Sequence, residues 1–100
     1  NTMKKILIVD DEYMIANSCV QILETKNYLV NTAGGVAEAK KQLAREKFHM
    51  VISDISLRGE SGMVLLRYIR ENYPGIGVIM MTGNPEVSEA ECRMEGAFNY

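Results

Sequence analysis

The amino-acid sequence predicts an α/β fold in which helices cover both faces of a parallel β-sheet. Short apolar runs with many β-branched residues occupy positions 6–9, 50–52 and 78–81, and a weaker run occupies positions 29–30. Runs of this length without polar alternation indicate strands that are buried on both faces. Helical patterns lie between the runs, and strands that alternate with helices form parallel sheets with right-handed crossovers. We therefore predict a three-layer, doubly wound domain.

The elements are expected in the order β-α-β-α-β-α-β-α. Residues 73–75 (Tyr-Pro-Gly) end the third helix, and residues 84–85 (Asn-Pro) begin the fourth. Residues 98–100 are predicted to start a further strand. The helices are indicated by apolar residues at helical spacing, namely Ile15, Cys19, Ile22 and Leu23; Val36, Ala39 and Leu43; Leu65, Leu66 and Ile69; and Val87, Ala90 and Met94.

Length and composition predict one globular domain over residues 1–100. Hydrophobic residues make up 47% and charged residues 24% of the chain. With 11 basic and 13 acidic residues, the net charge of −2 attracts neither DNA nor an anionic membrane. Cys19 and Cys92 lack the spacing of a metal site, and no apolar run approaches the ~18 residues of a membrane span. We expect a cytoplasmic domain without direct contact to nucleic acid or membrane.

Polar residues follow three of the apolar runs at the point where each predicted strand ends. Asp10 and Asp11 follow the first run, Asp54 ends the third, and Thr82 follows the fourth. The carboxyl ends of parallel strands lie at one end of the sheet, where ligands of open α/β sheets bind. If the first and third strands are neighbours, the three aspartates converge. Carboxylates that repel each other need a cation, and hard oxygen ligands favour Mg²⁺.

The same residues suggest phosphoryl chemistry. A carboxylate such as that of Asp54 can form an aspartyl-phosphate while a cation stabilises charge on the transferring oxygens, and Thr82 adds a hydroxyl donor. Each residue alone has an ordinary explanation, because a single Asp after a strand is usually a helix cap or turn residue. The coincidence of polar groups at one end of the sheet favours a functional interpretation.

These residues resemble the receiver domain of bacterial two-component response regulators. The resemblance is carried by residues 6–12, residues 51–55 with Gly62, residues 80–83 and residues 96–100. Three of these segments are most similar to receivers attached to sigma-54-dependent activators. The resemblance implies a flavodoxin-like fold with strand order 2-1-3-4-5, in which the last strand and last helix are incomplete within this sequence.

Carried over position by position, the resemblance implies a metal and phosphoryl site. Asp54 would accept a phosphoryl group from a sensor histidine kinase with Mg²⁺. Asp11 would ligate the ion directly, Asp10 mainly through a bound water, and Ser56 through its backbone carbonyl.

The remaining implied roles concern the phosphoryl group and the switch. Thr82 would hydrogen-bond the phosphoryl group and move toward it. Gly83 would leave room for the group, and Asn84 would flank it. Tyr100 would be the switch aromatic that reports the movement to the surface.

The implied function is a signalling switch and not an enzyme. The switch would act on an output domain or effector beyond residue 100, in transcription control, and such domains also form homodimers. The alternative is a Mg²⁺-dependent hydrolase that forms an aspartyl-phosphate; that family usually has a second Asp where this chain has Ser56. A flavodoxin-like FMN module is disfavoured because the acidic residues 10–12 would repel phosphate.

Three departures from the family pattern affect these expectations. Arg58 replaces the usual Pro four residues after Asp54, so we expect the loop at 57–61 to be more mobile. Glu89 replaces a small apolar residue, which leaves the packing of the fourth helix open. The family has a Lys three residues after the position of Tyr100, which the sequence does not reach. We therefore expect a domain that is truncated before the end of its fifth strand and fifth helix.

Overall fold

A parallel sheet of four strands forms the centre of the computed structural model, which describes residues 3–81. The strands are β1 (Lys5–Val9), β2 (Leu29–Ala33), β3 (Met50–Asp54) and β6 (Gly77–Met81), in the order β2-β1-β3-β6. All neighbouring pairs are parallel. The predicted α/β class and the order of the first four sheet strands are therefore confirmed.

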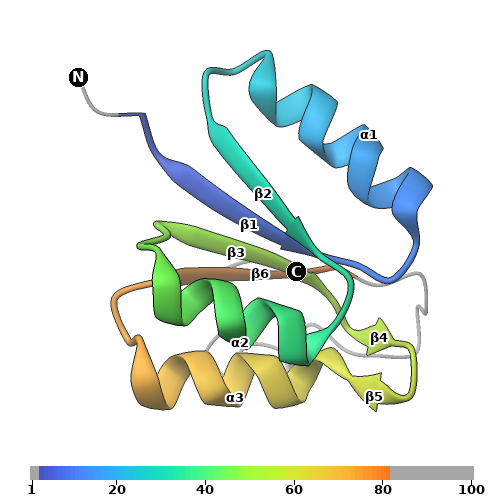
Figure 1. Ribbon diagram of the computed structural model, residues 1–100, viewed down its shortest axis with the longest axis vertical. Helices are drawn as coiled ribbons and strands as arrows, with labels where there is room; N and C mark the ends of the chain where they lie inside the picture. The colour runs from blue at the N-terminus through green and yellow to red at the C-terminus, as the bar shows by residue number, and fades with distance from the viewer. Residues whose placement is uncertain (1–2, 82–100) are drawn as a thin grey trace.

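Helices cover both faces of the sheet, as Figure 1 shows. The helix α1 (Tyr13–Glu24) packs on one face, and α2 (Val36–Arg45) and α3 (Gly62–Asn72) lie side by side on the other. Among residues 3–81, no helix combines the length and apolar character needed to cross a membrane. The predicted fourth helix and the strand at 98–100 lie outside the described residues, as does the side chain of Ile15.

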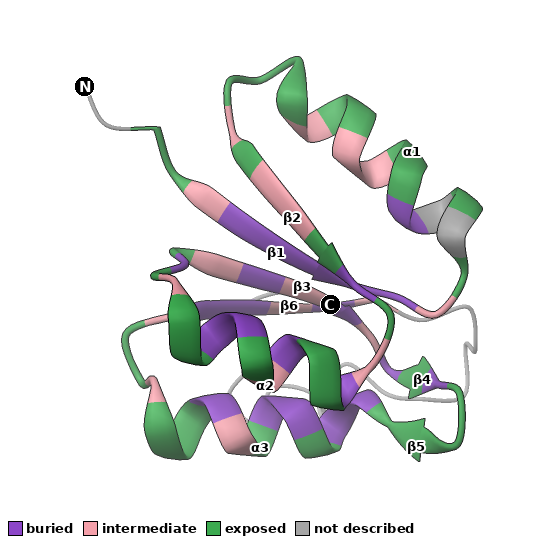
Figure 2. Cartoon of the chain, in the orientation of Figure 1, coloured by how far each residue is buried: buried purple, intermediate pink, exposed green. Residues whose placement is uncertain are grey.

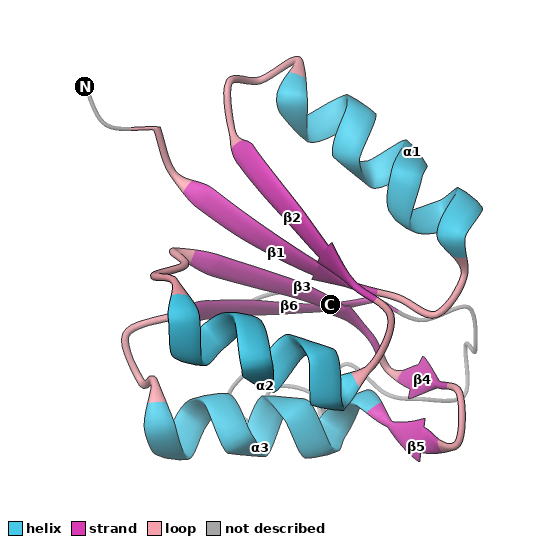
Figure 3. Cartoon of the chain, in the orientation of Figure 1, coloured by secondary structure: helices cyan, strands magenta, loops and turns pink. Residues whose placement is uncertain are grey.

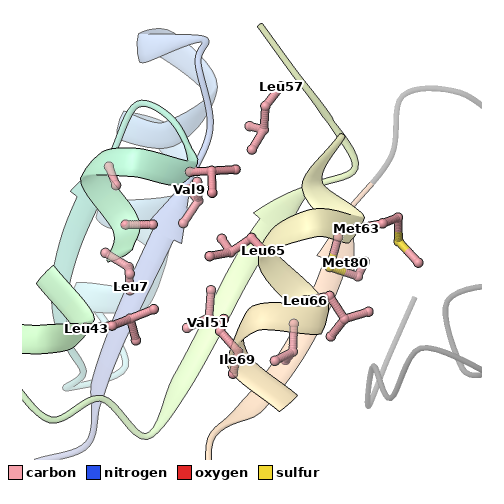
Figure 4. Close-up of a cluster of buried hydrophobic side chains, with 14 of the residues drawn as sticks. Leu7, Val9, Leu43, Val51, Leu57, Met63, Leu65, Leu66, Ile69 and Met80 are labelled. Atoms are coloured by element: carbon pink, nitrogen blue, oxygen red, sulfur yellow. The ribbon is translucent and has the colours of Figure 1, made fainter. Parts of the chain in front are cut away.

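The central strand β1 has apolar residues on both sides because both faces are covered. Leu7 and Val9 belong to the cluster beneath α2 and α3, which Figure 4 shows, whereas Ile6 and Ile8 belong to the cluster beneath α1. The four side chains have exposed fractions of 2% or less. This double burial explains why the sequence of β1 shows no polar alternation.

The exposed residues of the helices face away from the sheet, as Figure 2 shows. The predicted apolar residues of α2 and α3 are buried as expected. In α1 one expectation is wrong, because Ile22 is 59% exposed. The face of α1 that packs on the sheet instead includes Ala16, Val20 and Leu23, which are three or four residues apart, and Ile22 falls beside this row.

A two-stranded hairpin follows the sheet strand β3 and was not predicted. Its strands, β4 (Ser56–Leu57) and β5 (Glu60–Ser61), pair antiparallel around the dipeptide Arg58-Gly59 (Figure 3). Gly59 has a φ of 76°, a conformation that glycine adopts without steric cost. This hairpin includes the loop at 57–61, whose greater mobility stays a prediction.

Candidate metal centre

Three aspartates converge at the carboxyl end of the sheet. Asp10 and Asp11 follow β1, and Asp54 is the last residue of β3. One carboxylate oxygen from each lies within 4.8 Å of the others. The proximity follows from the pairing of β1 with β3, in which Val9 is opposite Ser53. These are all the aspartates that the chain contains.

Backbone hydrogen bonds fix the position of Asp10. Its N–H donates to the carbonyl oxygen of Ala33 at 3.0 Å, which extends the pairing of β1 with β2 by one residue. Its Oδ1 accepts from the backbone N–H of Glu12 at 2.8 Å, a turn that Asp favours. Asp10 is only 4% exposed, so its carboxylate is held in a buried turn and retains a second oxygen.

Asp54 is fixed by contacts on both its side chain and its backbone. Its Oδ1 accepts from the N–H of Ser56 at 3.0 Å, and its carbonyl oxygen accepts from Ser53 Oγ at 3.0 Å. The next N–H, that of Ile55, donates to the carbonyl oxygen of Met81 at 2.8 Å. Sequence reasoning gave no role to Ser53, which is 1% exposed and supports the Asp54 peptide.

Gly62 allows the start of α3 to touch the Asp54 backbone. A Cβ atom at this position would overlap the carbonyl oxygen of Asp54 and lie 3.1 Å from the Cα of Ile55. Such separations are shorter than van der Waals contact, so only glycine fits without a shift of the backbone. The sequence marked Gly62 as part of a motif, and the structure supplies the physical reason for it.

The charges of the three carboxylates oppose one another. Burial raises the pKa of Asp10 above its ordinary value, and the charges of Asp54, Asp11 and Glu12 raise it further. The hydrogen bond from the Glu12 N–H lowers this pKa and offsets part of the rise. Clustered carboxylate oxygens of this kind suit a hard divalent cation such as Mg²⁺, which would remove the repulsion.

A hollow of about 190 Å³ adjoins Asp10 and Asp11 on the side of β2. Thr32, Gly34 and Glu38 also line it. Glu38 Oε2 accepts from the N–H of Gly34 at 2.8 Å, so a fourth carboxylate is held beside the cluster. Mg²⁺ in proteins usually keeps several water ligands, and a hollow of this size accommodates them. Sequence reasoning missed Glu38, which no motif marked.

Several predicted site residues lie outside the described part of the chain. These are Thr82, Gly83, Asn84 and Tyr100. Ser56 is described, and its N–H binds Asp54 while its side chain is exposed. The roles assigned to these residues from the sequence stay predictions.

Fold and site together define a doubly wound α/β domain with an acidic pocket at the carboxyl end of β1 and β3. Residues 6–100 match the family described as the response regulator receiver domain. The chain belongs to this family of two-component systems, as its motifs indicated.

Two curated relatives come from Pseudomonas aeruginosa. The response regulator protein FleR is 33% identical over 97 residues, which cover 96% of this chain and 20% of FleR. The alginate biosynthesis transcriptional regulatory protein AlgB is 32% identical over 97 residues, which cover 96% of this chain and 22% of AlgB. The chain thus spans about a fifth of the length of these relatives.

Solved structures share the fold. A CheY-like receiver domain protein from Methanospirillum hungatei is 34% identical with a TM-score of 0.90, covering 99% of this chain and 80% of that one. The response regulator TrrA from Thermotoga maritima, solved in complex with Mg(2+)-BeF, is 30% identical with a TM-score of 0.88. That match covers 98% of this chain and 84% of TrrA.

Proposed function

We propose that this domain is a phosphorylation-controlled switch whose phosphoacceptor is Asp54. The observation that carries the proposal is the convergence of Asp10, Asp11 and Asp54 within 4.8 Å at the carboxyl end of the sheet. The donor would be the phosphohistidine of a sensor kinase. The readout would be an output domain or effector outside the sequence given, in the cytoplasm and in transcription control of the sigma-54-dependent type.

The residues of the site would hold Mg²⁺ through oxygen atoms. Asp11 and Asp54 offer half-buried carboxylates, Asp10 a buried one, and Ser56 a backbone carbonyl. When bound, the ion would neutralise the carboxylates and stabilise charge on the phosphoryl oxygens. The donor set consists of hard oxygen atoms, which is what this ion prefers.

Asp54 would act as the nucleophile. The N–H of Ser56 holds its Oδ1 at 3.0 Å, which orients the carboxylate plane and favours attack through Oδ2. An oxygen–phosphorus bond would form while the phosphorus–nitrogen bond to the kinase imidazole breaks, and the imidazole nitrogen would keep the electron pair. Thr82, Gly83 and Asn84 would surround the transferred group, and Tyr100 would report it.

The relatives support this proposal by their names. TrrA was solved with Mg(2+)-BeF, and AlgB is named a transcriptional regulatory protein. The departure at Ser56, where a hydrolase of the aspartyl-phosphate type usually has a second Asp, favours a switch over that alternative.

The test is labelling of Asp54 by a small phosphodonor. The protein is incubated with Mg²⁺ and acetyl phosphate, and the added phosphoryl group is detected by intact mass. We expect labelling that Asp54→Asn abolishes and chelation of Mg²⁺ prevents. Glu60→Gln, which changes an exposed carboxylate in the adjacent hairpin, is the matched control and should leave labelling intact.

Labelling that persists in Asp54→Asn would refute the assignment of the phosphoacceptor. Repeated release of phosphate from an excess of a phosphate monoester would instead identify the hydrolase alternative.

A further inference from the structure

We propose that a hollow at the amino end of the sheet binds an acidic peptide segment of a partner protein through one apolar anchor side chain. The hollow has a volume of about 550 Å³ and lies where the C-terminal ends of α2 and α3 meet. Figure 1 shows that these two ends point the same way, away from the carboxyl ends of β1 and β3. The lining of the hollow includes Leu43, Arg45, Lys47, Phe48, Tyr73 and Ile76.

The apolar side chains that line the hollow belong to the folded core or pack against it. Leu43 and Phe48 are buried, and Tyr73 and Ile76 are half-buried and pack against the cluster beneath α2 and α3. Because these side chains belong to the folded core, the hollow is formed before any ligand binds. A preformed apolar hollow of this size fits an aliphatic or aromatic anchor.

A tilted pair of aromatic rings and a cation–π contact extend the wall along α3. The rings of Tyr68 and Tyr73 have centroids 6.1 Å apart at an interplanar angle of 59°. The Nζ of Lys40 lies 4.5 Å from the centroid of the Tyr68 ring. This contact places a positive charge of α2 beside the apolar wall.

Two cations, Arg45 and Lys47, line the hollow, although the chain has a net charge of −2. Lys40 and Lys41 precede them on α2, outside the lining. The acidic residue between Arg45 and Lys47, Glu46, pairs with Lys5 and accepts from Asn31. A partner segment with carboxylates next to its apolar anchor would therefore complement Arg45 and Lys47.

The ordinary explanation of these cations accounts for part of the pattern. A basic residue in the last turn of a helix compensates the helix dipole, which explains Arg45. Lys47 lies beyond the end of α2, and dipole compensation requires no apolar hollow. The C-terminal end of α2 thus borders a surface that an acidic peptide fits.

The test is binding of a short fluorescein-labelled peptide with one central Leu flanked by Glu residues, measured by fluorescence anisotropy. We expect saturable binding that weakens at least about fivefold in the variant with Arg45→Glu and Lys47→Glu. Both residues are exposed, so the fold should persist, and circular dichroism checks this. Lys26→Glu makes the same kind of charge change at the turn after α1 and should leave binding unchanged.

A second peptide in which Ser replaces the central Leu tests the anchor and should bind at least about fivefold more weakly. The absence of saturable binding, equal binding of the Ser peptide, or an equal effect of Lys26→Glu would overturn the proposal. Preferential binding of an oligothymidine strand over the Leu peptide would overturn it in favour of nucleic acid. None of these outcomes depends on phosphorylation of Asp54.

Discussion

The two ends of the sheet differ in how their charges are balanced. At the carboxyl end, Asp10, Asp11 and Asp54 face one another, and the hydrogen bonds to Asp10 and Asp54 come from neutral backbone N–H groups. At the amino end, the ammonium of Lys5 binds Glu46. The first end thus holds like charges together, and the second pairs opposite ones.

A polar network continues from Glu46 toward the outer strand β2. Asn31 Nδ2 donates to Glu46 Oε2 and to Gln42 Oε1, both at 3.0 Å, and Gln42 Nε2 donates to the carbonyl oxygen of Thr32 at 2.7 Å. The network ties α2 to β1 and β2 and satisfies its own polar groups. The comparison teaches that this fold pairs opposite charges where α2 meets β1 and β2, and holds three like charges together, which a cation can compensate, at the carboxyl end.

The largest effect on this comparison is expected from Gly62→Ala. The added Cβ would overlap the Asp54 carbonyl, so either α3 or the phosphoacceptor peptide must move. Overpacking of this kind costs about 1–3 kcal/mol, and we expect a loss near the upper end, measured by urea denaturation. Gly75→Ala is the control, because nothing lies within 4 Å of its added Cβ. Equal losses in the two variants would show that the contact with Asp54 is unimportant.

A somewhat smaller loss is expected from Gln42→Ala, which breaks the amino-end network. Gln42 is 7% exposed, and its removal leaves the Thr32 carbonyl and the Asn31 amide without this partner. Thr32 is exposed and Asn31 keeps its hydrogen bond to Glu46, so the cost is that of the two lost hydrogen bonds, about 0.5–1.5 kcal/mol each. Gln21→Ala, on the exposed face of α1, should cost much less in the same denaturation experiment. A loss no larger than that of the control would mean that the network adds nothing to stability.

Asp10→Asn, unlike Gly62→Ala and Gln42→Ala, should increase the free energy of unfolding in the absence of Mg²⁺. Burial raises the folded pKa of Asp10 above its unfolded value, so the native state binds the proton more tightly. Wild-type stability therefore falls as the pH rises through the interval between the two pKa values, and the variant should lack this fall.

In the presence of Mg²⁺, the wild type should instead be more stable than Asp10→Asn. A ligand that binds only the folded state stabilises it, and loss of a carboxylate should lower the affinity for Mg²⁺ by at least about tenfold. Denaturation with Mg²⁺ and with chelator tests this. Failure of Mg²⁺ to stabilise the wild type would count against a cation site.

The smallest effect is expected from Glu46→Gln. The hydrogen bond from Lys5 lowers the pKa of Glu46, and burial opposes this effect. The charge of Lys5, the hydrogen bond from Asn31 and the charge of Arg45 lower the pKa further. The stability from this carboxylate is therefore present above its unfolded pKa and is lost as the pH falls through the folded value. We expect a small loss at neutral pH that salt reduces, because the pair is partly exposed to solvent. An unchanged denaturation midpoint at low salt would contradict this expectation.

Most of the fold follows from local patterns in the sequence. The runs at 6–9, 50–52 and 78–81 predict the central strands, because strands covered on both faces need apolar residues at every position. The same logic places Asp10 and Asp54 at one end of the sheet. Strand adjacency came from the family resemblance, since periodicity says nothing about which strands pair.

The missed features depend on contacts between distant segments. The hairpin rests on pairing between Ser56 and Ser61, and the need for glycine at position 62 rests on the path of the Asp54 backbone. Glu38 lines the hollow beside Asp10 and Asp11, and it binds the N–H of Gly34 from the first turn of α2. Each of these requires three-dimensional proximity that residue types alone do not encode.

The confinement of every aspartate in the chain to one pocket has a practical consequence for spectroscopy. Protein synthesised with isotope-labelled aspartate would give carboxyl signals from that pocket with no background from other positions. Titration with acid, with a divalent ion or with a phosphodonor would then be followed at individual carboxyl groups.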